Sequence, residues 1–191
     1  MKEYYTMEIA GLTRRLPVCR IGDDLCIAAF ILFGDVEMTV RSAAELLKRA
    51  PKYDILITPE AKSIALVHEM ARQNGANRYI IARKAVKLYM RDVLSVEVQS
   101  ITTANRQTLY IDGADAAYMR GRDVLIVDDV ISTGESLAAV ETLVRQAGGR
   151  VAGRMAVLAE GGARNRDDIT ALAYLPLLDG DGNPLTGEVR L

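Results

Sequence analysis

Short runs of aliphatic residues alternate along this chain with longer stretches in which apolar residues recur every three or four positions. The short runs, such as 124–127, have the length and continuity of strands buried on both faces of a parallel sheet. The longer stretches, such as 137–147, have the spacing of amphipathic helices, and that one stops at Gly148 and Gly149. The pattern predicts strands over 5–9, 25–33, 54–58, 78–82, 124–127, 151–159 and 171–177, and helices over 36–49, 61–73 and 137–147.

The stretch from 93 to 112 has a different pattern. Two β-rich runs, 93–103 and 108–112, lie on either side of a polar turn around Asn105, which predicts a projecting antiparallel hairpin. The alternation elsewhere predicts an α/β fold, a doubly wound parallel sheet into which this hairpin is inserted. No repeat, linker or low-complexity segment divides the 191 residues, so we expect a single domain over 1–191.

The segment between the strand at 124–127 and the helix at 137–147 carries the strongest chemical signal. Asp128 and Asp129 come directly after the strand, and adjacent carboxylates there can accept hydrogen bonds from a vicinal diol or from water on a hard cation. Free N–H groups at a helix start attract phosphate. The segment therefore fits a ribose 5-phosphate, although a capped helix preceded by two solvated acids is the alternative. The phosphate-binding candidates are Ser132, Thr133, Gly134, Glu135 and Ser136.

Two further loops follow strands and carry cations. Ala61 and Lys62 open the helix after the strand at 54–58, where a helix start beside a lysine suits pyrophosphate. Arg83, Lys84 and Lys87 follow the strand at 78–82 and could neutralise pyrophosphate as it leaves. An ordinary strand-to-helix loop and a solvated basic loop are the competing interpretations of these two segments.

Charge and composition exclude several classes of protein. The chain has 24 basic and 25 acidic residues and a net charge of −1, so no general affinity for nucleic acid or an acidic membrane is expected. No apolar run approaches the roughly 20 residues that cross a bilayer, and the first residues lack an apolar signal core. Cys19 and Cys26 match no zinc motif and are expected to be reduced thiols in a cytoplasmic protein.

The string from Val124 to Ser136 resembles the phosphoribosyl-pyrophosphate (PRPP) binding motif of type I phosphoribosyltransferases. The residues from Glu60 to Ser63 are similar to the acid, small residue, Arg and Gly of adenine enzymes, with Lys62 and Ser63 in the last two positions. The segment 83–88 is similar to their Arg-Lys-x-x-Lys-Leu pattern, whereas 93–102 looks more like a loop of bacterial xanthine enzymes. The resemblance covers about residues 54–160.

The resemblance implies transfer of a 5-phosphoribosyl group from PRPP to a purine, with release of pyrophosphate and with Mg²⁺ as cofactor. Asp128 and Asp129 would hold the ribose hydroxyls and contact the metal only through ribose or water. Residues 132–136 would bind the 5-phosphate, and Ala61, Lys62, Arg83, Lys84 and Lys87 would bind pyrophosphate. Asp128, Asp129 and Lys87 are the catalytic candidates. The family's pyrophosphate loop often contains a non-proline cis peptide bond.

The identity of the purine base depends on segments outside the PRPP motif. The resemblance implies a small N-terminal hood, here 12–32, and a sheet-edge segment, here 159–166, that read the base. Adenine is favoured because of 83–88, with xanthine or guanine as the alternative. A regulator that binds PRPP without turning it over is a second alternative. The resemblance also implies a homodimer in which 83–87 reaches the neighbouring subunit's site.

Overall fold

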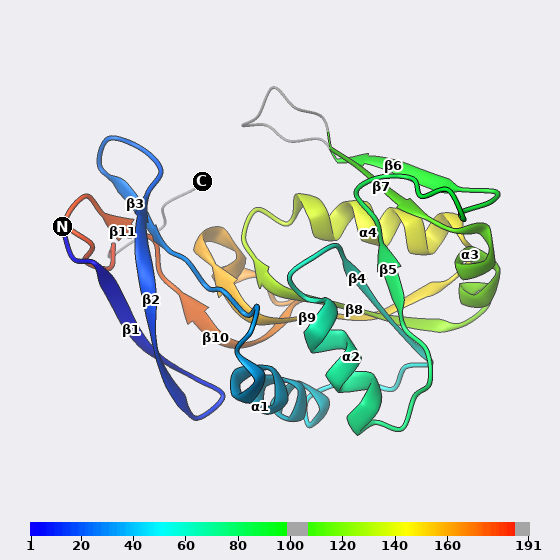
Figure 1. Ribbon diagram of the computed structural model, residues 1–191, viewed down its shortest axis with the longest axis horizontal. Helices are drawn as coiled ribbons and strands as arrows, with labels where there is room; N and C mark the ends of the chain where they lie inside the picture. Colours follow the sequence, from blue (N-terminus) through cyan, green and yellow to red (C-terminus); the bar gives the residue numbers. More distant parts are fainter. Residues whose placement is uncertain (99–106, 186–191) are drawn as a thin grey trace.

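The computed structural model describes residues 1–98 and 107–185, and its centre is a five-stranded parallel sheet (Figure 1). Apolar side chains occupy both faces of this sheet, as continuous aliphatic strands require. The strands, in spatial order, are β10 (Thr170–Leu175), β9 (Arg150–Glu160), β8 (Asp123–Ile131), β4 (Ile55–Pro59) and β5 (Ile80–Ala82).

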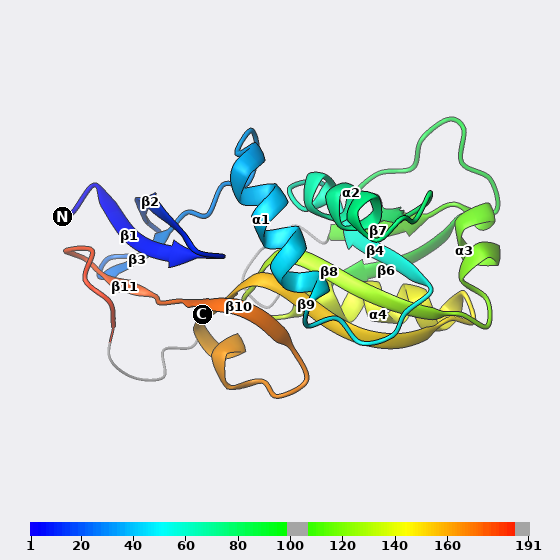
Figure 2. The same cartoon turned by 90° about the horizontal axis from the view of Figure 1, so that it is seen from below.

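Helices cover both faces of the sheet, which confirms the predicted doubly wound architecture. Figure 2 shows α1 (Val36–Leu47) and α2 (Ile64–Gln73) on one face and α4 (Glu135–Gln146) on the other. Alternate strand residues divide accordingly, since Leu56 and Leu125 pack toward α1 and α2 while Ile57 and Ile126 pack toward α4. None of the described helices is long and apolar enough to cross a bilayer.

The predicted hairpin is present as β6 (Leu94–Val98) and β7 (Gln107–Ile111), paired antiparallel. It lies over α4 in Figure 1, and Leu109 and Ile111 are buried in the same cluster as the apolar face of that helix. The turn around Asn105 lies outside the described residues. A short helix that we did not predict, α3 (Gly113–Met119), follows the hairpin, and Asp112 caps it by accepting a hydrogen bond from Ala114 N at 2.8 Å.

The N-terminal part forms a second, antiparallel sheet, in the order β1 (Tyr4–Ile9), β2 (Leu12–Arg20), β3 (Leu25–Ala28) and β11 (Leu178–Asp179). We missed β2 because its arginines and Pro17 interrupt the apolar pattern. Arg14 of this strand pairs with Asp35, the N-cap of α1, at 2.7 Å and ties the sheet to the main body. The predicted strand 25–33 was too long, since pairing with β2 ends at Ala28.

Two boundaries near the paired acids also differ from the prediction. The strand predicted over 124–127 extends through Asp128 and Asp129 as part of β8, because β9 continues to pair with it as far as Ile131. The helix predicted to begin at residue 61 begins at Ile64, because 61–63 form a turn that contacts β8. In the structure the turn at 61–63 therefore lies beside the two acids of β8.

Candidate active site at the carboxyl edge of the sheet

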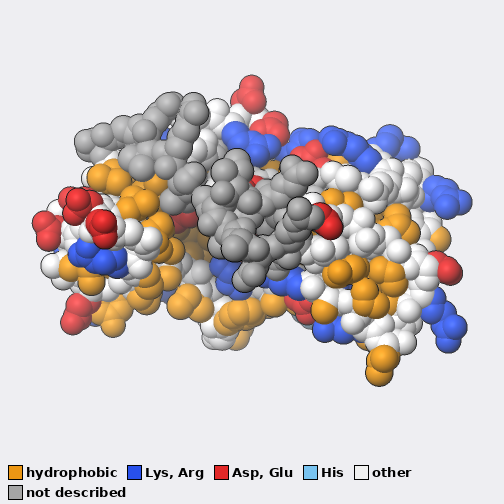
Figure 3. All heavy atoms as spheres, turned by 90° about the horizontal axis from the view of Figure 1, so that it is seen from above, with side chains coloured by type: hydrophobic (Ala, Val, Ile, Leu, Met, Phe, Trp, Pro, Cys, Tyr) orange, Lys and Arg blue, Asp and Glu red, His pale blue; other side chains and the backbone are white. Residues whose placement is uncertain are grey.

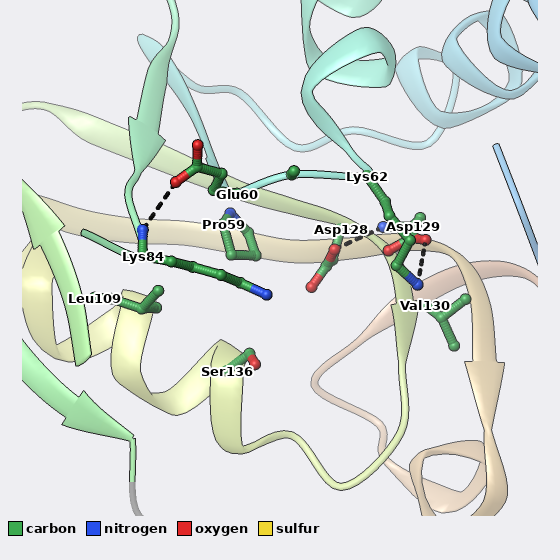
Figure 4. Close-up of a pocket in the computed structure, with 10 residues that line it drawn as sticks. Pro59, Glu60, Lys62, Lys84, Leu109, Asp128, Asp129, Val130 and Ser136 are labelled. Carbon is green, nitrogen blue, oxygen red and sulfur yellow. Dashed lines mark hydrogen bonds and ion pairs between the residues drawn. The ribbon is translucent and has the colours of Figure 1, made fainter. Parts of the chain in front are cut away.

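A cavity of about 280 Å³ opens where β4 and β8 end, at the edge of the sheet where open α/β proteins bind ligands. Its walls come from several segments that are distant in the sequence, and Figure 4 shows their side chains converging on one space. The lining residues are Pro59, Glu60, Ala61, Lys62, Lys84, Leu109, Asp128, Asp129, Val130 and Ser136. The cavity therefore brings together members of all three segments that the sequence singled out.

The paired acids extend beyond one of their neighbouring strands. Pairing of β8 with β4 ends at Ile126, whereas pairing with β9 continues to Ile131. Asp128 and Asp129 consequently have an open side toward the turn at 61–63. Backbone groups that lose a strand partner need another one when they are buried.

Ser63 provides that partner. Its side chain is fully buried, and its Oγ accepts a hydrogen bond from Asp129 N at 2.8 Å. The same hydroxyl lies 2.5 Å from Asp128 Oδ1 and donates to it. Asp128 Oδ1 also accepts from Asp129 N at 2.8 Å, so the first acid is held by two donors.

Lys62 stands beside the second acid. Its Nζ lies 3.1 Å from Asp129 Oδ2, and Figure 4 shows this ion pair within the cavity. Asp129 is 3% exposed, and apart from this ion pair its Oδ2 is buried without a hydrogen-bond partner in the described part of the chain. A buried carboxylate oxygen in this state is an acceptor available to a ligand hydroxyl or a bound water.

The two carboxyl groups affect one another electrostatically. Desolvation raises the pKa of Asp128 above its usual value, and the adjacent Asp129 raises it further. The hydrogen bond from Ser63 acts in the opposite direction because it stabilises the ionised form of Asp128. Donors such as sugar hydroxyls would favour the ionised form in the same way.

The loop after β8 has the backbone shape expected of a phosphate cradle. Gly134 adopts a φ of 84°, a left-handed conformation that favours glycine, and it caps the N-terminus of α4. Ser136 lines the cavity and Glu135 begins α4, while Ser132, Thr133 and Gly134 form the adjoining bend. A Cβ at position 134 would lie 2.5 Å from Arg166 Nη1, so the end of the Arg166 side chain would have to shift.

Glu60 connects the turn before α2 to the basic segment after β5. The Glu60–Ala61 peptide bond is cis, in the loop for which the resemblance implied such a bond. Glu60 accepts a hydrogen bond from Lys84 N at 2.9 Å, and Figure 4 shows the Lys84 side chain extending into the cavity. Arg83 donates to Tyr89 Oη at 2.8 Å and pairs with Glu60 Oε1 at 3.5 Å. Neither Arg83 nor Lys87 lines the cavity.

Glu160 is a residue that the sequence did not single out within the segment 159–166. It ends β9 and is 8% exposed, and its side chain makes no hydrogen bond or ion pair in the described part of the structure. Burial raises the pKa of Glu160, while attraction to the Lys62 ammonium opposes that rise. The strand was predicted to end at residue 159. Had it been extended by one residue, Glu160 would have stood out as an acid at the end of a strand beside the cavity.

The donors present suit Mg²⁺ held mainly by water and substrate oxygens. The described residues contain no cluster of three or more acids, histidines or cysteines that could enclose an ion. Magnesium usually keeps several waters and takes only one or two carboxylates. Asp129 Oδ2, which has Lys62 beside it but no hydrogen-bond partner, and the neighbouring Asp128 fit that outer role.

Comparisons with known proteins show which family this chain is similar to. The family model "Phosphoribosyl transferase domain" matches residues 35–178. An adenine phosphoribosyltransferase of Clostridium perfringens is 32% identical over 128 residues, covering 67% of this chain and 71% of that protein. One from Rhodococcus jostii is 37% identical over 109 residues, covering 57% of this chain and 59% of that protein.

The solved structures that this chain resembles are also adenine phosphoribosyltransferases. The adenine phosphoribosyltransferase of Thermoanaerobacter pseudethanolicus has a TM-score of 0.64 at 25% identity, covering 75% of this chain and 84% of that one. The Saccharomyces cerevisiae enzyme, solved with adenine, has a TM-score of 0.61 at 19% identity, covering 90% and 92%. Since the family model spans most of the chain, including the paired acids and the loop after them, this protein belongs to the phosphoribosyltransferase family and is most similar to its adenine enzymes.

Proposed function

We propose that this protein transfers the 5-phosphoribosyl group of PRPP to adenine, forming the nucleotide and releasing pyrophosphate in purine salvage. The observation that carries the proposal is that Asp128 and Asp129, with Lys62 beside them, share one cavity with Lys84 at the start of α4. Acceptors for a diol, N–H groups for a phosphate and cations for a pyrophosphate are thereby brought within a single substrate's reach.

The residues of the chain would act mainly by positioning and by charge. Asp128 and Asp129 accept hydrogen bonds from the ribose hydroxyls, and the loop 132–136 binds the 5-phosphate. The bond from ribose C1 to pyrophosphate then breaks as a bond from C1 to a purine nitrogen forms, and the proton of that nitrogen passes to the released pyrophosphate. Positive charge grows on the ribose and negative charge on the leaving group as the bond to pyrophosphate breaks. Bound Mg²⁺ would add charge neutralisation at the pyrophosphate.

Lys62 and Lys84 would bind the leaving pyrophosphate in the cavity of their own chain. Both line the cavity, and Lys84 approaches it from the segment that Glu60 anchors. Figure 3 shows several basic side chains along the upper margin of the molecule and at its right-hand end, although the net charge of the chain is only −1. A basic region beside the cavity favours the approach of a polyanionic substrate.

Glu160 supports the choice of adenine. A carboxylate accepts hydrogen bonds, and the adenine C6 substituent is an amino donor, whereas hypoxanthine, guanine and xanthine carry an oxo acceptor there. An acid at the edge of the site would therefore be left facing another acceptor with a 6-oxopurine. Buried polar groups without partners give strong discrimination between substrates.

A turnover assay with PRPP, Mg²⁺ and each purine base tests the proposal. Adenine should give the highest kcat/KM, with xanthine or guanine lower by orders of magnitude. Turnover of xanthine or guanine without use of adenine would overturn the choice of base. Tight PRPP binding without turnover of any purine would favour a PRPP-sensing regulator.

We also propose a homodimer in which the segment 83–89 contacts the neighbouring subunit. Val86, Leu88 and Tyr89 are 53%, 109% and 66% exposed, which is unusual for large apolar side chains in one short segment. Lys87, which lies outside its own chain's cavity, would then act in the partner's site. The free thiols of Cys19 and Cys26 suit the reducing cytoplasm that we propose as its location.

Hybrid dimers test the role of Lys87. Lys87→Ala and the double variant Asp128→Asn with Asp129→Asn should each be nearly inactive alone. Mixing the two should restore part of the activity, because one site of each hybrid then has intact acids and an intact partner lysine. A monomer with full activity, measured by light scattering at assay concentration, would refute the shared site.

A further inference from the structure

Two consecutive residues of the turn before α2 contact the two acids of β8. Lys62 lies against Asp129, while Ser63 contacts Asp128 and the backbone of Asp129. The chain thus links the loop assigned to pyrophosphate with the acids assigned to the ribose. Ser63 is fully buried and does not line the cavity, so the substrate is not its direct partner.

The Ser63 hydroxyl uses both its donor and its acceptor capacity at this point. It accepts from Asp129 N at 2.8 Å, in place of the strand partner that β8 loses when its pairing with β4 ends. It donates to Asp128 Oδ1 at 2.5 Å, and its separation from Asp129 Oδ1 is 3.3 Å. This hydroxyl, together with Asp129 N, thereby holds Asp128 Oδ1 in place and leaves the second oxygen of that carboxylate for another donor.

We infer that Ser63 is a positioning residue for PRPP: its hydroxyl orients Asp128 toward the ribose diol and joins the pyrophosphate turn to the ribose-binding acids. The inference rests on the proposed function, because it assumes that Asp128 accepts from the ribose. A glycine at position 63, as in the adenine-enzyme pattern that 60–63 resemble, could not do this. Ser63 is therefore a feature of this chain rather than of that pattern.

A double-mutant cycle on PRPP binding tests the inference, with calorimetry in the presence of Mg²⁺. Ser63→Ala should weaken PRPP binding about tenfold or more, the scale of a lost hydrogen bond to a charged group. In an Asp128→Asn background the same change should have little further effect, because the oriented carboxylate is already absent. Ser63→Gly should behave like Ser63→Ala and serves as a second variant if one of them folds poorly.

Ser42→Ala is the matched control, since Ser42 is equally buried but lies on α1, where its Oγ is 3.4 Å from Met38 Sδ. It should leave PRPP binding unchanged at a comparable melting temperature. Wild-type affinity in both Ser63 variants would overturn the inference, and so would losses that add fully to those of Asp128→Asn, since they indicate a general structural role. A wild-type protein that binds no PRPP would overturn the proposed function itself, and with it this inference.

Discussion

Replacing both acids of β8, Asp128→Asn together with Asp129→Asn, is expected to lower kcat/KM about a thousandfold or more. Each carboxylate is assigned a charge-assisted hydrogen bond to the ribose, worth about 2 kcal/mol, and two such losses correspond to about 4 kcal/mol. The amides keep the shape of the side chains. They also relieve the repulsion that accompanies the raised pKa of Asp128, so the fold should remain intact. Steady-state kinetics at varied PRPP, with circular dichroism for folding, measures the effect.

Two acids at the opposite edge of the same sheet provide the control. Asp54 lies just before β4 and accepts from Asp123 N at 2.9 Å, while Asp123 begins β8 and pairs with Arg150. The double change Asp54→Asn and Asp123→Asn should therefore leave kcat/KM near the wild-type value. A folded Asp128 and Asp129 double variant with near-wild-type turnover at saturating PRPP would contradict the assignment of the acids.

Changing the acid at the end of β9, Glu160→Lys, is expected to lower kcat/KM for adenine about a hundredfold. The substitution replaces an acceptor by a donor and opposes the adenine amino group, a loss of about 2–3 kcal/mol for a hydrogen bond to a charged group. It should also reduce the discrimination against 6-oxopurines, because an ammonium group can donate to their oxo oxygen. The ratio of kcat/KM for adenine and hypoxanthine measures both effects.

Glu69→Gln is the control for burial. Glu69 is as buried as Glu160, at 8% exposure, but it lies on α2 and pairs with Arg72 at 2.8 Å. Its replacement should lower stability without changing the ratio between bases. If Glu160→Lys leaves that ratio unchanged while PRPP binding persists, the base is read elsewhere, and the N-terminal sheet becomes the candidate.

The parallel sheet and its helices could be predicted because their signals are local. Aliphatic runs such as Val124 to Val127 are buried on both faces, and a helical period such as that of 137–147 needs no tertiary information. The acids and the loop after them could be located for the same reason, since an aliphatic run followed by Asp128, Asp129 and a glycine-containing turn is visible in a single segment.

What could not be predicted depends on pairing between distant segments. β2 contains polar residues along its whole length and is a strand because β1 and β3 flank it. The role of Ser63 depends on where β4 stops pairing with β8, and that of Glu160 on how far β9 continues. In each case the structure depends on pairing with a neighbouring strand. The periodicity of the segment itself carries no information about that pairing.

The central claim is tested most directly by identifying the products formed from adenine, PRPP and Mg²⁺. Chromatography of the mixture should show AMP and pyrophosphate appearing together in equal amounts, with none formed by the Asp128→Asn and Asp129→Asn double variant. Pyrophosphate without nucleotide would indicate hydrolysis of PRPP alone. Absence of any nucleotide from every purine tested, with the folded wild-type protein, would contradict the account.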